Sequence, residues 1–143
     1  MLSKVLDWYK IRHPQYSLGN RPNEFSRRYL TNLCESILLP VSQRFGEVTI
    51  TYGFTSYPLL KYVQKNSPGD MAPNIDQHAS IELNTKGNRV CRREGAACDF
   101  FVNGYEDKMV EIARFITAEL NYDRLYFYGN DNPIHVSIGP AHS

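Results

Sequence analysis

The sequence lacks an uninterrupted stretch of about eighteen apolar residues, the length that a membrane-spanning helix requires. Its beginning, MLSKVLDWYKIRH, also lacks the apolar segment of a secretory signal peptide. Cysteine is scarce, since the chain has three cysteines and no C-x-x-C motif, which is typical of a reducing compartment. These absences predict a cytoplasmic protein without a membrane span. A phage-type lysin, which reaches the cell wall without a signal peptide, would share them.

Neither sign of charge is in excess, because 16 lysines and arginines nearly balance 15 aspartates and glutamates. The formal net charge of +1 does not point to nucleic acid or to a membrane surface as a partner. The composition is that of a globular protein, with 42% hydrophobic and 22% charged residues. The length of 143 residues predicts one domain, residues 1–143, that buries a real core.

Hydrophobic periodicity predicts both helices and strands. Apolar residues at helical spacing predict helices over 2–12, 24–45, 59–64 and 105–120. Asn23 can cap the second helix, Pro40 should bend or break it, and Gly46 should end it. Alternating or β-branched segments predict strands over 48–54, 100–102, 125–128 and 134–138. The predicted fold class is therefore α+β: a mainly antiparallel sheet of about four strands, with helices packed on one face and residues 1–23 as an N-terminal helix and loop.

Two histidines and one aspartate on separate segments are the candidate metal ligands: His78, Asp99 and His135. Imidazole nitrogens and carboxylate oxygens are donors that Zn²⁺ accepts, and three protein ligands with a position left for water are typical of a catalytic site. Gly95 and Ala97 are small, so two backbones can approach closely beside Asp99. Strand alternation should turn Cys98 away from the metal, which predicts a buried thiol.

These residues resemble the zinc-binding pattern of the M15 peptidases, the family of D-Ala-D-Ala carboxypeptidases with the hedgehog-type fold. The family pattern is S-x-H-x-x-G-x-A-x-D with a later histidine on a strand; here the matching segments are Gln77-His78, Gly95-x-Ala97-x-Asp99 and Ile134-His135-Val136. Upstream, residues 33–46 and 48–56 are similar to the family's helix ending L-x-P-L-R-x-x-x-G and strand ending S-G-Y-R-S. The resemblance covers residues 24 to 140 and implies a zinc-binding, peptidase-like domain.

The chain departs from that pattern at three places. The family separates the first histidine from the glycine by two residues, whereas His78 and Gly95 enclose an insertion at 79–94. The family's arginine is Thr55 here, and Asn132 stands where many members carry a catalytic glutamate. Because amide hydrolysis needs a proton carrier, the predicted catalytic residues are Asp131, next to Asn132, and Glu94, from the insertion.

The insertion alternates on either side of a turn at residues 85–88, which predicts a β-hairpin. Its arginines could clamp a carboxylate or phosphate beside the metal, so the predicted substrate-binding residues are Arg92 and Arg93, together with Thr55 and Tyr57. Alternatively, the hairpin is a solvated edge whose charges discourage strand pairing, with Glu94 satisfying one of the arginines. The irregular loop over 66–74 is expected to form a rim of the site.

Two functions follow from the resemblance and the residues. The first is a zinc-dependent metallohydrolase of M15 peptidase type that cleaves a peptide or amide bond, with peptidoglycan stem peptides as a candidate substrate. The second is a zinc-stabilised binding domain without peptidase activity, which holds a small anionic ligand, such as a nucleotide or carboxylate, with the cleft and the basic hairpin.

Overall fold

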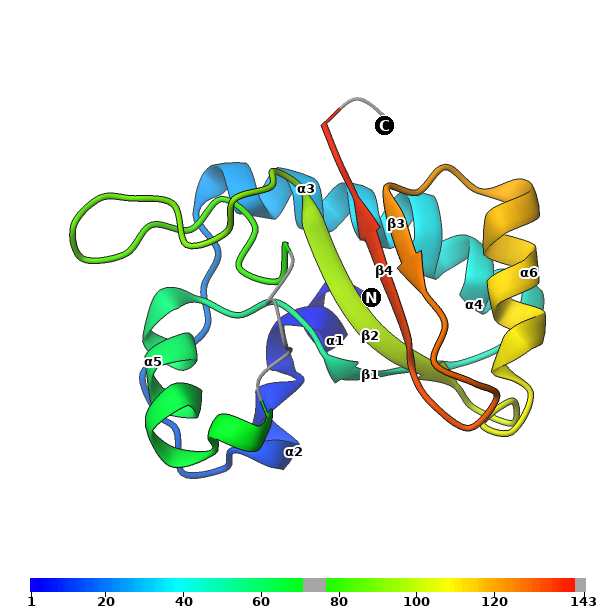
Figure 1. The fold of residues 1–143 in the computed structure, drawn as a ribbon, viewed down its shortest axis with the longest axis horizontal. Coiled ribbons are helices and arrows are strands. Elements are labelled where there is room, and N and C mark those ends of the chain that lie inside the picture. The colour runs from blue at the N-terminus through cyan, green and yellow to red at the C-terminus, as the bar shows by residue number, and fades with distance from the viewer. Residues whose placement is uncertain (71–76, 141–143) are drawn as a thin grey trace.

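The fold is built on one antiparallel sheet (Figure 1). The computed structural model describes residues 1–70 and 77–140. In this part of the chain, strands β1 (Val48–Tyr52), β2 (Ala96–Val102), β3 (Arg124–Tyr126) and β4 (Ile134–Ile138) pair in the order β1-β2-β4-β3. The predicted α+β class with a four-stranded antiparallel sheet is confirmed.

The predicted helices form, with shifted boundaries and one interruption each in the first two. They are α1 (Leu2–Asp7), α2 (Tyr9–Arg12), α3 (Glu24–Leu33), α4 (Leu39–Phe45), α5 (Tyr57–Asn66) and α6 (Met109–Glu119), with a π-helical turn, η1 (Cys34–Leu38), and a 3-10 turn, η2 (Pro68–Asp70). No helix in residues 1–70 and 77–140 is both long and apolar enough to cross a membrane.

The long helical segment from α3 to α4 follows its sequence signals closely. The side chain of Asn23 caps α3 by accepting a hydrogen bond of 2.8 Å from the Ser26 amide. Pro40 does not break the helix; the turn before it widens into η1, where the Leu39 N–H donates to the Cys34 carbonyl. This wider turn relieves the clash that a proline ring makes with the preceding helical turn. Gly46 ends α4 with a φ of +121°.

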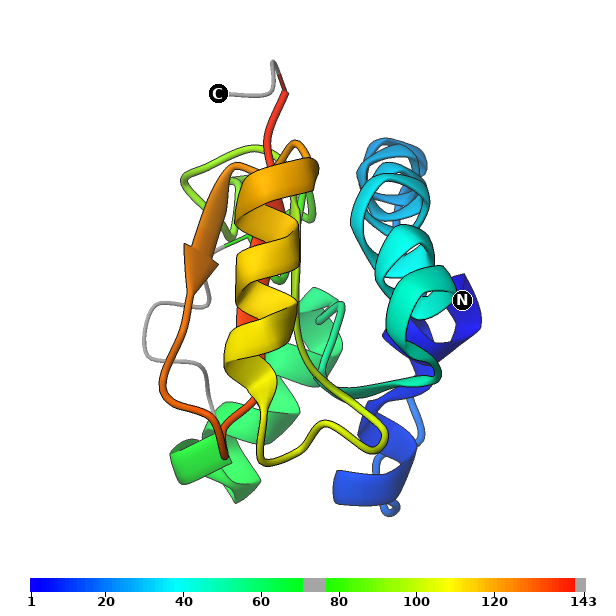
Figure 2. The same ribbon diagram turned by 90° about the vertical axis from the view of Figure 1, so that its right-hand side faces the viewer.

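The main core lies between one face of the sheet and helices α1, α3, α4 and α6. Alternate residues of β2 and β4 enter this core, and they include Cys98, Phe100, Ile134 and Val136. Helices α4 and α6 lie side by side over it, where the rings of Phe45 and Phe115 meet edge to face at 5.4 Å (Figure 2). A second cluster joins α2 and α5 to the end of β1 through Trp8, Tyr9, Tyr16, Tyr52, Leu59 and Val63. Because strand side chains alternate, Asp99 and His135 are left on the sheet face opposite the main core.

The segment 79–94 folds back on itself, as predicted, but the predicted pair of strands is wrong. One isolated antiparallel bridge joins Leu83 to Arg89, supported by backbone hydrogen bonds from Asn84 to Asn88 and from Val90 to Glu82. Side-chain hydrogen bonds, instead of a regular ladder of backbone hydrogen bonds, hold this loop in place. Glu82 accepts hydrogen bonds from the Asn23 amide and the Ser26 hydroxyl, which fastens this loop to the start of α3.

Candidate metal centre

His78 is held by the backbone that follows β1. Its Nδ1 lies 3.0 Å from the Gly53 carbonyl, and its own carbonyl accepts a 3.0 Å hydrogen bond from the Thr55 amide. A carbonyl can only accept, so Nδ1 carries a proton, which leaves Nε2 as the nitrogen that would bind a metal. The imidazole is fully buried, and within the described residues its Nε2 has no hydrogen-bond partner. A buried nitrogen without such a partner is costly unless something coordinates it.

Asp99 and His135 are brought together by strand register. They are directly paired residues of β2 and β4, so their side chains share one face of the sheet. His135 Nδ1 lies 2.7 Å from Asp99 Oδ1, and His78 Nε2 lies 3.4 Å from the same oxygen. The side chain of Asp99 is 25% exposed, whereas those of His78 and His135 are 0% and 6% exposed. Solvent and ligands therefore approach this group of residues from the side of Asp99.

The three predicted ligands converge, and together they could hold a metal ion. Their ligand atoms all lie within 4.8 Å of one another, and among the residues that the structure describes they form a compact His–Asp–His group. Cys98 is fully buried in the main core and does not take part, which confirms that its thiol turns away.

The carboxyl group of Asp99 is ionised over the whole physiological range. Burial alone would raise its pKa, but the hydrogen bonds and charges of His135 and His78 outweigh burial and hold the pKa well below its ordinary value. A carboxylate that is already deprotonated can bind a cation without first releasing a proton. The carboxylate of Asp99 itself is therefore in the form that binds a cation.

Gly95 sets the distance between the two ligand-bearing strands. A Cβ at this position would lie only 1.9 Å from the Ile138 carbonyl oxygen, and its φ of +133° is one that side chains rarely adopt. Ala97 is fully buried and pairs with Ser137 between Gly95 and Asp99. The expectation that small residues permit close backbone approach beside Asp99 is confirmed.

Two tyrosines flank the histidines, and neither was predicted. The Tyr52 ring meets His78 edge-on with centroids 4.6 Å apart, and the Tyr126 ring stacks on His135 at 5.2 Å. For Tyr126 the sequence carries a usable signal. If the hairpin of residues 125–138 closes around 129–132, strand alternation makes Tyr126 the cross-strand neighbour of His135. The bulge between Ile50 and Tyr52 hides the corresponding signal at Tyr52.

The predicted catalytic carboxylates lie outside the group. Glu94 accepts a 3.0 Å hydrogen bond from the Tyr29 hydroxyl and lies 3.8 Å from Arg89, as the alternative pairing with an arginine predicted. It precedes Asp99 by five residues, about 16 Å of extended chain. Asp131 is exposed on the turn that joins β3 to β4, four residues before His135. Neither belongs to the His–Asp–His group.

The predicted substrate-binding residues are dispersed. Thr55 is fully buried, and its hydroxyl lies 3.4 Å from the Gly53 carbonyl, so it supports the loop that holds His78 and does not face a substrate. Arg93 forms an ion pair with the nearly buried Asp123, which also accepts a 2.9 Å hydrogen bond from Gln77. Arg92 is exposed.

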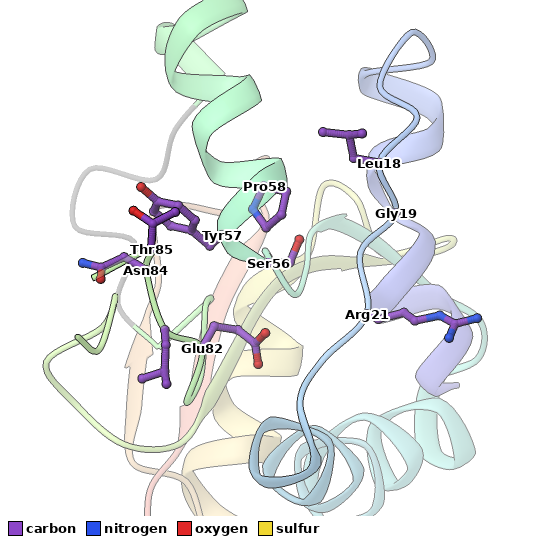
Figure 3. A pocket seen from close by; sticks show the side chains of 10 residues that line it. Leu18, Gly19, Arg21, Ser56, Tyr57, Pro58, Glu82, Asn84 and Thr85 are labelled. Atoms are coloured by element: carbon purple, nitrogen blue, oxygen red, sulfur yellow. The ribbon is translucent and has the colours of Figure 1, made fainter. Parts of the chain in front are cut away.

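Tyr57 borders a separate cavity of about 480 Å³, which Figure 3 shows between the N-terminal segment, the start of α5 and the 79–94 loop. The lining residues are Leu18, Gly19, Arg21, Ser56, Tyr57, Pro58, Glu82, Leu83, Asn84 and Thr85. Arg21 and Glu82 contribute opposite charges, and in Figure 3 the guanidinium of Arg21 points away from Tyr57. The cavity is therefore not a strongly positive one. The rim predicted at 66–74 lies partly outside the described residues.

Comparison of the chain with protein-family models, curated proteins and solved structures gave no match. The chain has an α+β fold in which Asp99 and His135, from the sheet, and His78, from a turn, form a group that could hold a metal ion. Membership of the M15 peptidases stays a prediction from the sequence motifs.

Proposed function

We propose that the protein is a zinc-dependent metallohydrolase of M15 peptidase type, which cleaves a peptide or amide bond. The observation that carries this proposal is the convergence of His78, Asp99 and His135, three residues from distant segments, on one point. Their nature, two imidazoles and a carboxylate, is that of three-ligand catalytic zinc sites. The buried Nε2 of His78, which makes no hydrogen bond within the described residues and lies 3.4 Å from Asp99 Oδ1, is the nitrogen that would face the cation.

Two of the three separations between ligand atoms are close to those of a tetrahedral ion, and all three are within 4.8 Å. Ligand atoms bound to tetrahedral zinc at about 2.0–2.1 Å lie about 3.3 Å from one another. His78 Nε2 and Asp99 Oδ1 already have a separation of 3.4 Å. The 2.7 Å contact between His135 and Asp99 would lengthen by about 0.6 Å, which a rotation of either side chain provides.

Each residue then has a definable role. A zinc ion in this place would polarise the substrate carbonyl and lower the pKa of a bound water. His78, Asp99 and His135 would hold the ion, and the Gly53 carbonyl fixes the His78 tautomer. Asp99 faces the open side, where a substrate would enter. Asp131 and Glu94 remain the proposed proton carriers.

The test begins with metal content. The full chain, purified without added zinc and then titrated with it, should bind one equivalent, and His78→Ala and Asp99→Ala should each lose that binding. His13→Gln is the matched control, because His13 is a buried histidine in the separate aromatic cluster of Trp8 and Tyr62. A folded protein that binds no divalent ion would refute the proposal.

Hydrolysis is tested next, on purified peptidoglycan and on peptides ending in D-Ala-D-Ala. We expect cleavage that requires zinc and disappears on chelation. Loss of cleavage in Asp131→Ala or Glu94→Ala, with zinc retained, would identify the proton carrier. A zinc-loaded protein that cleaves none of these substrates would argue against peptidoglycan stem peptides as the substrate.

The second candidate, a zinc-stabilised domain that holds an anion, receives less support. Two arginines of the 79–94 loop already face carboxylates, since Arg89 lies 3.8 Å from Glu94 and Arg93 pairs with Asp123. Arg92 is exposed and is the loop arginine best placed to meet a ligand from solution. Thermal stabilisation by phosphorylated or carboxylated compounds, abolished in Arg92→Ala, would favour this candidate over the hydrolase.

A further inference from the structure

Three consecutive aromatic residues at the end of the edge strand β3 are exposed beside the candidate metal centre. Tyr126, Phe127 and Tyr128 have exposed fractions of 37%, 41% and 62%. A contiguous patch of exposed apolar rings commonly marks a binding site. The position of these rings relative to His135 indicates which ligand would bind here.

Tyr126 and Tyr128 share one side of the chain. Tyr126 pairs with His135 across β3 and β4, and its ring stacks on the imidazole at an angle of 24° between planes. The Tyr128 ring lies 6.4 Å from the Tyr126 ring, which places it on the same side and farther from the metal ligands. Leu125 packs against the main core on the opposite face, and alternation turns Phe127 the same way as Leu125.

The Tyr126 hydroxyl is also fixed in place. It accepts a 3.1 Å hydrogen bond from Arg124, which precedes it by two residues and therefore lies on the same face of β3. The ring is thus held at its hydroxyl by the guanidinium and at one face by His135. A ring that is held at two points and still 37% exposed is a preformed surface for a flat or apolar group.

We propose that Tyr126 and Tyr128 form a binding platform for a bulky apolar side chain of the substrate, next to the bond that is cleaved. This inference rests on the proposed function, because the platform would contact a substrate only if His135 helps to hold the catalytic metal beside it. It names the substrate class as peptides with an aromatic or large aliphatic residue beside the scissile amide. Stacking on tyrosine favours such a side chain over the methyl group of alanine.

Two hydroxamates that differ by one phenyl group test the platform without requiring catalysis. Propionohydroxamate and 3-phenylpropionohydroxamate chelate a metal through the same two oxygen atoms, so the ratio of their dissociation constants reports the contact made by the phenyl group. Titration calorimetry on the zinc-loaded full chain should show the phenyl compound binding about tenfold more tightly, the gain expected for a favourable aromatic contact.

Three variants distinguish the contact with the phenyl group from changes in metal chelation or in the overall structure. Tyr128→Ala should reduce the phenyl advantage to about twofold or less, while leaving the affinity for propionohydroxamate unchanged. Tyr126→Phe keeps the ring and should keep the advantage. Phe127→Ala is the matched control, because it removes a neighbouring exposed ring that alternation turns to the opposite side of the chain.

The outcomes also distinguish this inference from the proposed function. Equal binding of the two hydroxamates, or a phenyl advantage that survives in Tyr128→Ala and disappears in Phe127→Ala, would overturn the platform. Binding of neither compound to zinc-loaded protein would overturn it too, while leaving the metal centre intact. A phenyl advantage in a protein that hydrolyses nothing would support the platform and count against the hydrolase.

Discussion

Replacing Gly95 with alanine should force apart the two strands that carry Asp99 and His135. The added Cβ would lie 1.9 Å from the Ile138 carbonyl oxygen and 2.9 Å from the Gln77 side-chain nitrogen. Carbon and oxygen atoms in contact are ordinarily about 3.3 Å apart, so one of the two backbones must move by more than 1 Å. Ile138 cannot yield easily, since it belongs to β4 and is paired with Ala96.

The cost has two parts that can be separated. An alanine at a φ of +133° is strained by about 1–3 kcal/mol, and the overlap with β4 adds about 1–3 kcal/mol. Gly46 has a similar φ of +121°, but a Cβ there would have nothing within 4 Å. Gly46→Ala therefore carries the backbone strain alone, and the difference between the two variants measures the overlap.

Urea denaturation of the metal-free proteins measures both free energies of unfolding. We expect Gly95→Ala to be less stable than Gly46→Ala by about 1–3 kcal/mol. Zinc affinity, measured by competition with a chelator, should fall in Gly95→Ala and stay unchanged in Gly46→Ala, because only the first moves Asp99 relative to His135. Equal stability and equal zinc affinity in the two variants would refute the reasoning.

Four further measurements test other parts of the structure. Zinc at one hundred times its dissociation constant should stabilise the protein by about 2.7 kcal/mol in a thermal scan, and His135→Ala should abolish the effect. Asp123→Ala should cost about 2 kcal/mol in urea, less than a fully buried pair, because the Arg93 side chain is 39% exposed. Burial raises the pKa of Cys34 to about 11 and all three cysteines are buried, so an aromatic disulfide reagent at pH 8 should modify them only after unfolding. The pKa of Asp99 is lower in the folded protein than in the unfolded chain, so its ionised carboxylate stabilises the metal-free fold above about pH 4. This stabilisation is lost as the pH falls from about 4 towards the pKa of the folded state. The stability of Asp99→Asn should therefore depend less on pH below about 4 than that of the wild type.

Local patterns predicted the parts of this molecule that depend on neighbouring residues. Alternation along β4 places Ile134 and Val136 in the core and His135 on the other face, as the sequence implied. The cap at Asn23 and the stop at Gly46 also formed, since each depends on a few consecutive residues. The spacing of small residues before Asp99 correctly indicated a close approach of two strands.

Contacts between residues far apart in the chain could not be predicted from the sequence. Nothing near Arg93 indicates that its partner is Asp123, thirty residues farther along the chain. Thr55 occupies a position that resembles a substrate-binding one, yet the fold buries it to support His78. The sequence around Thr55 is compatible with either an exposed or a buried side chain. The packing of residues 53–55 against His78 determines that it is buried.

The long connection between His78 and Gly95 leaves the metal-ligand geometry undisturbed because both of its ends are closed by hydrogen bonds. Gln77 donates to the Glu94 carbonyl at 2.8 Å, and the Ser80 hydroxyl donates to the Gly95 carbonyl. Gln77 and Ser80 adopt φ values of +53° and +47°, a strain that these bonds must offset. Since loop length adds little entropy cost once the ends are fixed, the residues between can vary in number and sequence without moving the ligands.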